Sequence, residues 1–484
     1  MKTNTLDFDA QALRDKILDL AMRGKLVKQD PNDEPASELL KKIKAEKAEL
    51  IKEKKIKKSK PLPPITDNEK PFDLPDSWEW VRLEEVGSVK NGKTPKKEDI
   101  NSQGPYPYFK VKDMNNNRLY MNKVESYVDE KYKNQLLPKN TIIFPKNGGA
   151  VLTAKKRILI QASLVDLNTG GLVPNSNINC KYLFYLFKSL NIKDYVKGSA
   201  VPTINSKKLK ETVVPLPPLS EQSRIAAKIA QLFALLRKVE SSTQQYAKLQ
   251  TLLKSKVLDL AMRGKLVKQD PNDEPASELL KKIKTEKAEL IKEKKIKKTK
   301  PLPPITDDEK PFDIPDSWEW VRLGDVLKPE IYRKPNVDFM YIDIASVNNK
   351  INKVTNPTKI IINKDKIASR ARQVLSKNDI LFSVVRPYLK NIAMVPNTKD
   401  VQVGSTGFYV LKPYDLLNRH YLFYLMLSKY VIQNMTNKMR GDNSPSIRKS
   451  DLQNLLIPLP PIDEQLQIVN IIQNLNLIFN KVQE

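Results

Sequence analysis

The sequence predicts an α+β protein in which two mixed α/β modules alternate with long, antiparallel, coiled-coil-like helices as a pseudo-twofold circular repeat. Three observations support this fold class. One segment of the chain occurs twice almost unchanged, the segments that follow its two copies are dissimilar, and a heptad pattern of apolar residues precedes the second copy. Together they indicate two different modules held in equivalent frames.

The repeated segment runs from Lys16 to Leu83 and again from Lys256 to Leu323, with only five substitutions between the copies. These are Ile17/Val257, Ala45/Thr285, Ser59/Thr299, Asn68/Asp308 and Leu74/Ile314. Weak similarity returns at "KYLFYLFKS" and "HYLFYLMLS", and it becomes plain at "VVPLPPLSEQ" and "LIPLPPIDEQ". The chain therefore alternates between shared and unshared segments.

A single long helix is predicted over 219–262, because this stretch contains no Pro or Gly and its apolar residues step by four and three. Ser220 and Glu221 supply the start signal of the helix. We interpret the apolar seam as scaffold core; it consists of Ile225, Ile229, Leu232, Leu236, Val239, Leu253, Val257 and Leu260.

The two ends of the chain carry the same seam in two halves. The C-terminal half consists of Ile468, Ile472, Leu475, Phe479 and Val482, and the N-terminal half of Leu13, Ile17 and Leu20. A repeat whose chain begins midway through a unit produces this pattern. We therefore expect the termini to lie near each other and the split rod to pack antiparallel against the central helix.

The repeated segment also predicts a second helix, opening near Ser37 or Ser277 and ending at "KPLPPI", where successive prolines cannot continue it. Between the helices, strands are expected at 141–144, 359–362, 379–385 and 407–411, with apolar helical stretches near Tyr182 and Tyr421. The predicted domains are an N-terminal helical region (1–74), a first module (75–218), a central helical spacer (219–314), a second module (315–461) and a C-terminal helix (462–484).

The composition of the chain narrows the classes of function that it can have. The 84 Lys and Arg against 56 Asp and Glu give a formal charge of +28, which favours a polyanionic partner such as nucleic acid. Cys180 and His420 are the only residues of their kinds, so an internal disulfide and the common Cys/His zinc sites are excluded. No apolar run is long enough to span a bilayer, and we expect a cytoplasmic protein.

"VGSVKNGKTP" has the glycine and lysine spacing of a P-loop, which would make the chain an NTPase. A P-loop needs a helix directly after the Lys-Thr pair, yet Pro95 and a polar stretch follow Thr94. We interpret the pattern as a basic turn that opens the first module.

The shared segments resemble the specificity subunit of type I restriction-modification enzymes. The strings that carry the resemblance are "ILDLAMRGKLVKQDPNDEPASELL", "PFDLPDSWEWVRL" and "IPLPPIDEQ" before a heptad helix. Within the modules, "NGKTPKKEDINSQGPYPYFKVKDM" is similar to one style of recognition-domain opening in that family, and "DILFSVVRPYLKN" and "STGFYVL" to another.

The resemblance implies a non-catalytic, sequence-specific DNA-binding subunit. Each module would be a target-recognition domain that reads one half of a bipartite site, and the helices would set the unread gap. Two methyltransferase subunits that bind S-adenosylmethionine would dock, together with two restriction subunits that use ATP and Mg. The chain itself would hold neither a cofactor nor a metal.

Candidate DNA contacts are Lys, Arg, Asn, Ser and Thr residues in predicted turns of the modules, since such side chains bind phosphates and base edges. In the first module they are Lys90, Asn91, Lys93, Thr94, Lys110, Lys112, Asn115, Asn116, Lys146 and Asn147. In the second they are Arg333, Lys334, Asn348, Asn349, Ser369, Arg370, Arg372, Arg386, Arg440 and Asn443. Arg370 and Arg386 are the strongest candidates, whereas Trp78, Trp80, Trp318 and Trp320 are expected to pack at the module–helix junctions.

Two other functions remain open from the residues alone. An enzyme, either an NTPase or a methyltransferase acting alone, would need a cofactor loop and a catalytic turn that the sequence lacks. A coiled-coil scaffold that binds nucleic acid without sequence preference would have no use for two dissimilar modules.

Overall fold

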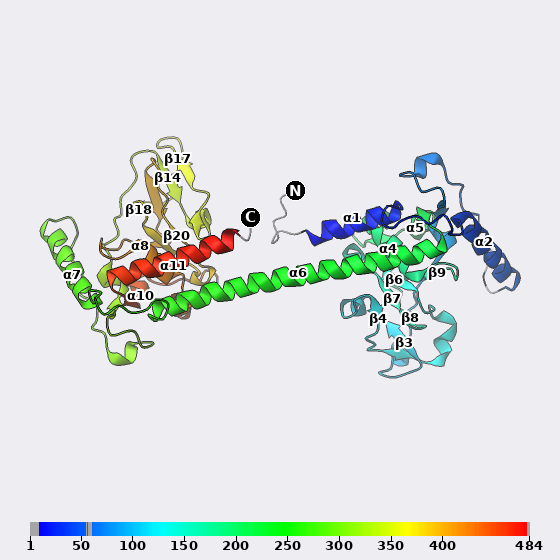
Figure 1. Cartoon of the computed structure of the whole chain (residues 1–484), viewed down its shortest axis with the longest axis horizontal. Helices are drawn as coiled ribbons and strands as arrows, with labels where there is room; N and C mark the ends of the chain where they lie inside the picture. Colours follow the sequence, from blue (N-terminus) through cyan, green and yellow to red (C-terminus); the bar gives the residue numbers. More distant parts are fainter. Residues whose placement is uncertain (1–8, 55, 57–60, 199, 482–484) are drawn as a thin grey trace. The chain divides into compact units, whose positions relative to one another are not determined.

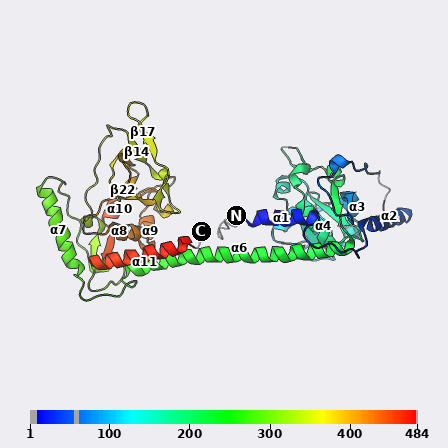
Figure 2. The same cartoon turned by 45° about the horizontal axis from the view of Figure 1, so that its top comes forward.

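The computed structural model of the chain describes residues 9–54, 56, 61–198 and 200–481. The described chain divides into two compact units, an N-terminal unit that ends at residue 242 and a C-terminal unit that begins at residue 243. Each unit combines long helices with a mixed α/β module, as Figures 1 and 2 show, so the predicted fold class is confirmed. Among the described residues, none of the helices qualifies as a membrane span.

The module of the N-terminal unit contains a five-stranded sheet of order β2-β9-β6-β7-β4 and a three-stranded sheet of order β5-β3-β8. The helix α4 (Cys180–Ser189) buries Leu183 and Phe187 in the core shared with the first sheet. The strand expected at 141–144 and the helix near Tyr182 are therefore confirmed. The strands are β2 (Gly87–Asn91), β3 (Tyr106–Phe109), β4 (Tyr120–Met121), β5 (Tyr127–Val128), β6 (Ile142–Pro145), β7 (Arg157–Leu159), β8 (Leu164–Val165) and β9 (Thr169–Pro174).

The module of the C-terminal unit contains a four-stranded sheet of order β17-β14-β21-β18 and a five-stranded sheet of order β15-β16-β20-β19-β22. The helices α8 (Arg419–Met426), α9 (Lys429–Asn437) and α10 (Lys449–Gln453) follow the strands. The strands are β14 (Phe339–Ile342), β15 (Val347–Asn348), β16 (Lys353–Val354), β17 (Thr358–Ile360), β18 (Ala371–Val374), β19 (Ile380–Ser383), β20 (Ile392–Met394), β21 (Gln402–Ser405) and β22 (Phe408–Leu411). All three expected strands and the helix near Tyr421 are present.

Each module enters and leaves its frame through one two-stranded antiparallel ribbon. In the N-terminal unit β1 (Glu79–Arg82) pairs with β12 (Val213–Leu216), and in the C-terminal unit β13 (Glu319–Arg322) pairs with β23 (Leu456–Leu459). Because the two chain ends of a module lie side by side in the ribbon, the sequence between them varies without changing the frame.

The helical frames confirm the predicted antiparallel packing within each unit. The 44-residue helix α6 (Leu219–Met262) contributes its first half to the N-terminal unit, where Glu240 pairs with Arg14 of α1 (Ala10–Met22). Its second half contributes to the C-terminal unit, where Lys254 lies over the ring of Phe479 of α11 (Ile462–Lys481). The expected closeness of the two termini, and Val482, lie outside the described residues.

The seam of α6 is buried only towards the two ends of the helix. Ile225 and Ile229 are fully covered and Val257 is nearly so, but Val239 and Leu253 are 46% and 45% exposed. The interpretation of the seam as core is therefore confirmed for Ile225, Ile229 and Val257 and is wrong for Val239 and Leu253. The described partner helices are shorter than α6, so they cover its ends and leave its middle open.

The second helix of each frame begins at Ala36 (α2, Ala36–Lys52) and at Ala276 (α7, Ala276–Lys292), one residue before the predicted starts. Pro35 and Pro275 are the capping residues, and their fixed φ is compatible with entry into a helix. The prediction of these helices is confirmed.

A buried polar contact ties each module to its frame. The indole Nε1 of Trp78 donates to Oε2 of Glu221 at 2.8 Å, and that of Trp318 donates to Oε2 of Glu464 at 2.7 Å. Both tryptophans are almost fully buried, and Trp80 and Trp320 each lie beside a phenylalanine ring. The expected packing role is confirmed for Trp78, Trp318 and Trp320, whereas Trp80 is only partly buried.

A Trp78→Phe substitution should lower the stability of the N-terminal unit by about 2–3 kcal/mol, because it removes a hydrogen bond to a charged acceptor and part of a buried ring. Burial raises the pKa of Glu221, so this carboxyl stabilises the fold when protonated, and that contribution is lost as the pH rises above its ordinary range near 4.5. Without the indole donor, the deficit should be larger at pH 8 than at pH 5.

Thermal unfolding followed at both pH values checks this prediction. Trp318→Phe is the matched variant and should affect the transition of the C-terminal unit in the same way, since Glu464 has the same donors and a similarly raised pKa. Equal deficits at pH 5 and pH 8 would contradict the assigned role of the carboxylate.

Candidate nucleic-acid interface

The end of β2 and the loop after β6 bring four predicted residues of the N-terminal unit together. Lys146 Nζ donates to Asn91 Oδ1 at 2.7 Å, and Asn147 Nδ2 donates to the carbonyl of Leu167 at 3.1 Å. Thr94 Oγ1 accepts from the amide of Leu167 at 3.1 Å. These side chains gather around the turn at 166–168, on the surface of the module.

The backbone geometry explains why "VGSVKNGKTP" forms this surface and not a P-loop. Residues 92–96 form neither a helix nor a strand after β2, and the next element is the three-residue 3-10 helix Lys97–Asp99. The amide of Lys93 donates to the carbonyl of Val165 at 2.8 Å, which leaves its side chain exposed. A side chain at Gly92 would approach the carbonyl of Asp166 to 2.0 Å, so this position requires glycine because of close backbone contact.

The remaining candidates of the N-terminal unit include a group on the 3-10 helix Val111–Asn115. Lys110 caps this helix and lies 5.6 Å from the ring centroid of Tyr108. Asn115 accepts from Lys155, and Asn116 Nδ2 donates to Glu125 at 3.2 Å. Lys112, like Lys90 of β2, is exposed and makes no side-chain hydrogen bond or ion pair with the described residues.

Asp166 connects these two groups of the N-terminal unit. Its amide donates to the carbonyl of Phe109, next to Lys110, at 3.0 Å, and its side chain accepts from Thr169 at 2.5 Å. Burial raises the pKa of this carboxyl above its ordinary value. Asp166 thus links two loops inside the module. Lys90, Lys93 and Lys112 have no side-chain partner among the described residues and are exposed to a ligand.

In the C-terminal unit, Arg386 and Asn443 lie together. Arg386 Nη2 donates to the carbonyl of Asn443 at 2.8 Å, and its amide donates to the carbonyl of Pro445 at 2.8 Å. Arg386 has φ +47°, a left-handed conformation that is costly for a side chain of this size. Such strain persists where surrounding contacts fix it, and it is typical of functional positions.

Arg440 and Asn349 lie beside this site, but their side chains bond to other residues of the chain. Both terminal nitrogens of Arg440 contact the carboxylate of Asp451, at 2.6 and 3.3 Å, so its guanidinium stabilises the loop at 440–446. Asn349 Nδ2 donates to the carbonyl of Leu389 at 2.8 Å, and Asn348 accepts from the amide of Lys350 at 3.0 Å.

A second group of the C-terminal unit lies at the edge formed by β18. The amide of Arg333 donates to the carbonyl of Arg372 at 2.8 Å, and Arg372 Nε donates to the carbonyl of Ser369 at 3.0 Å. The carbonyl of Arg370 accepts from Thr406 at 2.9 Å, which fixes its backbone. The exposed side chains of Arg333, Lys334 and Arg370 make no hydrogen bond or ion pair with the described residues.

The two modules place these loops equivalently although their sequences differ. In the N-terminal unit, Asn147 forms a bridge with Thr203, and in the C-terminal unit Val385 forms a bridge with Ser446. In each case the second residue after an inner strand of the five-stranded sheet, β6 or β19, meets the segment that precedes the ribbon. The next residue on each side donates its amide to a proline carbonyl at 2.8 Å, Gly148 to Pro202 and Arg386 to Pro445. Gly148 is therefore the equivalent of Arg386, and Lys146 and Asn147 lie directly before it in the same loop.

Exposed apolar side chains beside both loops are absent from the predicted set. Leu167 and Val201 are 52% and 62% exposed in the N-terminal unit, and Tyr388 is 45% exposed in the C-terminal unit. Such side chains can contact thymine methyl groups or stack on bases. Only their exposure distinguishes them from core residues, and the sequence does not reveal it.

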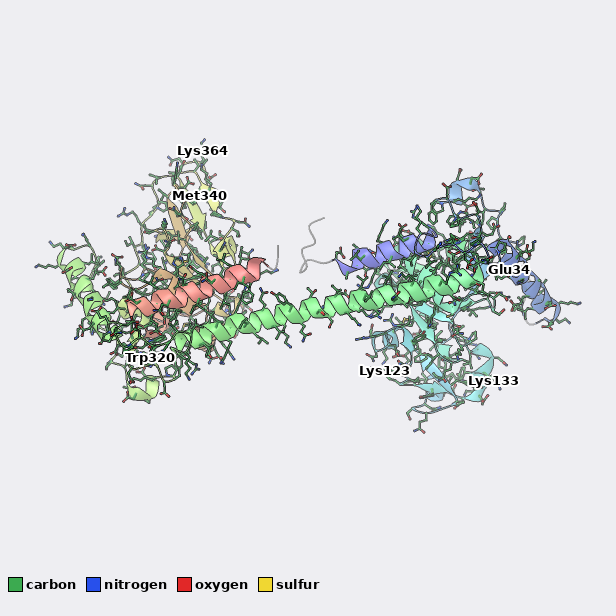
Figure 3. The ribbon with its side chains drawn as sticks, viewed as in Figure 1. Glu34, Lys123, Lys133, Trp320, Met340 and Lys364 are labelled. Carbon is green, nitrogen blue, oxygen red and sulfur yellow. The ribbon has the colours of Figure 1, made fainter. Side chains whose placement is uncertain are left out.

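Figure 3 shows where the side chains of the C-terminal module lie relative to its frame. Trp320 lies beside the helices, while Lys364 lies at the opposite tip of the module. No cluster of three or more His, Cys, Asp or Glu side chains suited to a metal ion occurs in the part of the chain that the structure describes. The features of the surface are basic and amide groups, which suit phosphates and base edges.

Comparisons with known proteins agree on one family. The family model described as type I restriction modification DNA specificity domain matches residues 75–250 and 315–483. The EcoAI specificity subunit of Escherichia coli is 34% identical, with 98% of this chain and 90% of the relative covered. The EcoEI specificity subunit of Escherichia coli is 36% identical, with 66% of this chain and 62% of the relative covered.

A solved structure supports the fold. The HsdS subunit from Thermoanaerobacter tengcongensis superimposes with a TM-score of 0.51 at 20% identity, covering 85% of this chain and 92% of that chain.

Proposed function

Because the chain belongs to the family of type I restriction-modification DNA specificity subunits, we propose that each of its two modules reads one half of a bipartite DNA site. As a specificity subunit it is a non-catalytic, DNA-binding part of the complex. The observation that carries the proposal is the pair of dissimilar modules in nearly identical frames, since identical frames place two different readers in equivalent settings.

The residues that would read DNA are those of the two equivalent loops, Lys146 and Asn147 in one module and Arg386 with Asn443 in the other. Asparagine and arginine present the paired groups that discriminate adenine and guanine in the major groove. The free lysines around them would neutralise phosphates and supply affinity without sequence information.

We further propose that the helices set the length of the unread gap and dock two methyltransferase and two restriction subunits. The methyltransferase would bring S-adenosylmethionine and the restriction subunits ATP and Mg, so this chain needs no cofactor, and the complex would act in the cytoplasm. A non-specific coiled-coil scaffold is not favoured, because one reader repeated twice would serve that role equally well.

Selection of binding sites from a random duplex library by the chain with its methyltransferase partner tests the proposal. We expect enrichment of two short, unrelated half-sites separated by an unread gap of constant length. One contiguous site, or no sequence preference at all, would refute it.

A further inference from the structure

The two copies of the frame present the same aromatic pair, but only one copy covers it. Phe72 and Trp80 have ring centroids 5.0 Å apart in the N-terminal unit, as do Phe312 and Trp320 in the C-terminal unit. An arginine lies over each phenylalanine, Arg23 at 4.3 Å and Arg263 at 4.4 Å. A difference in how the two aromatic pairs are covered therefore comes from the module beside each pair.

In the C-terminal unit, Tyr430 of α9 occupies this place. Its ring meets that of Phe312 edge-on, with centroids 5.6 Å apart at 81°. Its hydroxyl donates to the carbonyl of Leu456 in β23 at 2.9 Å, and Trp320 is left only 8% exposed. The C-terminal unit thus shows which side chain packs against this aromatic pair, namely a tyrosine.

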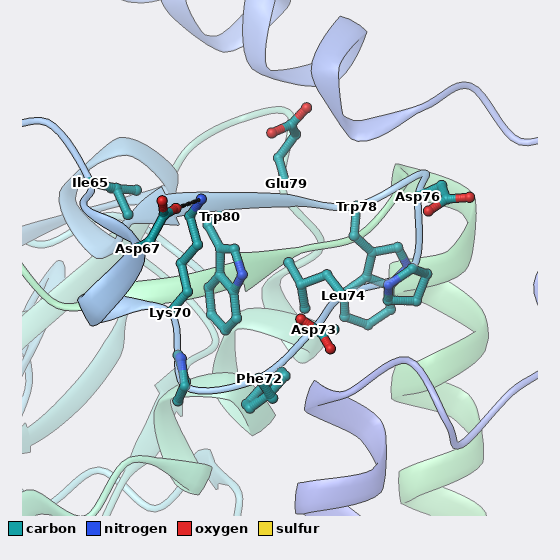
Figure 4. Close-up of a pocket in the computed structure, with 12 residues that line it drawn as sticks. Ile65, Asp67, Lys70, Phe72, Asp73, Leu74, Asp76, Trp78, Glu79 and Trp80 are labelled. Carbon is teal, nitrogen blue, oxygen red and sulfur yellow. Dashed lines mark hydrogen bonds and ion pairs between the residues drawn. The ribbon is translucent and has the colours of Figure 1, made fainter.

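In the N-terminal unit a groove opens beside the same aromatic pair. The groove, of about 800 Å³, is lined only by residues between Ile65 and Trp80, and Trp80 and Phe72 face it in Figure 4. After α4 this module has the short 3-10 helix Ile192–Tyr195 where the other has α9. Tyr195 of this 3-10 helix is buried in the core of the module, and no tyrosine ring among the described residues stacks on Phe72 or Trp80.

The hydrogen-bond acceptor for a tyrosine is also present. Val213 pairs with Arg82 in the first ribbon as Leu456 pairs with Arg322 in the second. The amide of Arg82 donates to Glu85 at 2.8 Å instead of across the ribbon. No side chain of the described residues donates to the carbonyl of Val213, which corresponds to the acceptor that Tyr430 uses.

The rim of the groove is acidic in a chain of formal charge +28. Asp67 is paired with Lys70 at 2.7 Å, but the carboxylates of Asp73, Asp76 and Glu79 have no hydrogen-bond or ion-pair partner in the described part of the chain. Such a rim favours cations on whatever carries the inserted ring.

We propose that the Phe72–Trp80 groove binds a tyrosine on a lysine- or arginine-bearing segment of a partner subunit, in the position that Tyr430 takes in the C-terminal unit. The proposal rests on the proposed function for the existence of partner subunits. Tyrosine is among the residues that most often anchor protein interfaces, because its ring is apolar and its hydroxyl finds a specific acceptor.

A peptide of this chain's own residues 426–437, added to the full chain, tests the chemistry of the groove without any partner. We expect it to shift the indole N–H resonance of Trp80 saturably and to leave that of Trp320 unmoved. The same peptide with Tyr430→Ala should bind at least tenfold more weakly. A Trp80 resonance that stays unmoved would overturn the proposal, whether or not a complex forms.

Crosslinking in the reconstituted complex with methyltransferase and restriction subunits identifies the occupant. With p-benzoylphenylalanine in place of Phe72, we expect a crosslink to a tyrosine-containing peptide of a partner subunit. The same replacement of Phe312 is the internal control and should crosslink to α9 of its own chain. A complex that assembles without a partner crosslink from position 72, or with one only to a second copy of this chain, overturns the proposal. Failure of any complex to assemble speaks against the proposed function instead, and the peptide result still decides the groove.

Discussion

Insertion of four helix-forming residues after Gln245 should lengthen the unread gap of the DNA site by one or two base pairs while both half-sites stay the same. Gln245 lies near the middle of α6, away from both modules, and its side chain is exposed. Four helical residues add about 6 Å and rotate the following helix by about 40°. One DNA base pair rises about 3.4 Å, so the added length corresponds to roughly two base pairs.

Binding to the original site should fall by a factor on the order of 10³, because a complex held at the wrong spacing engages only one half-site and each mismatched base pair costs about 1–3 kcal/mol. Site selection with the inserted variant measures the new gap, and competition between old and new sites measures the loss. Alanine replacement of Gln244 and Gln245 without insertion keeps the helix length and should leave the gap as it was. An unchanged gap after insertion would refute the spacer role of α6.

The helical frames could be predicted because their signals are local. Heptad spacing, the absence of Pro and Gly over 219–262, and the proline run after each second helix depend only on neighbours in the sequence. The strands β6, β19 and β22 could be predicted for the same reason, since each is a short run of β-branched and aromatic residues between turn residues. The near-identity of the frames then implied that their contacts would be duplicated, as the Trp78–Glu221 and Trp318–Glu464 pairs are.

The sites depend on non-local contacts that no local signal encodes. Arg440 was a candidate DNA contact because it lies in a polar loop, but its bidentate contact with Asp451 uses its guanidinium within the protein. The equivalence of Gly148 with Arg386, and so of the two loops that contain them, arises from bridges to segments some sixty residues away, between Asn147 and Thr203 and between Val385 and Ser446. These pairings leave no shared sequence motif.

The exposed residues of α6 show the same limit of local signals. Here the apolar pattern is present, but the burial that it predicts is not. A heptad pattern states that residues such as Val239 and Leu253 can pack, but not how far the partner helix extends. Tyr430 illustrates it again, because the aromatic pair is identical in both frames while its cover comes from a module with unrelated sequence. The local sequence pattern therefore predicts which surfaces are apolar enough to pack, and the tertiary structure decides which of them are buried.

Arg386→Lys should relax the preference for one base pair in the half-site read by the C-terminal module by about 1–3 kcal/mol, with little change elsewhere in the site. Lysine keeps the positive charge but lacks the planar fork that pairs with two acceptors of guanine. Because the carbonyl of Asn443 already accepts from Nη2 of Arg386, the guanidinium is held in one orientation before DNA arrives. Arg370→Lys should relax a different base pair of the same half-site, since Arg370 lies at the β18 edge and has no side-chain partner among the described residues.

Lys93→Gln in the N-terminal unit supplies the contrast. Its side chain is exposed, and we assign it to a phosphate, so its loss should weaken binding to all sequences alike and reduce the slope of log affinity against log salt by about one. Site selection at two salt concentrations measures both quantities for the three variants. If Arg386→Lys and Arg370→Lys merely lowered affinity for every sequence as Lys93→Gln does, the two arginines would be phosphate contacts. In that case direct readout by the C-terminal module would rest on other side chains, and those beside the same loops, Asn443 and Tyr388, would be the next to test.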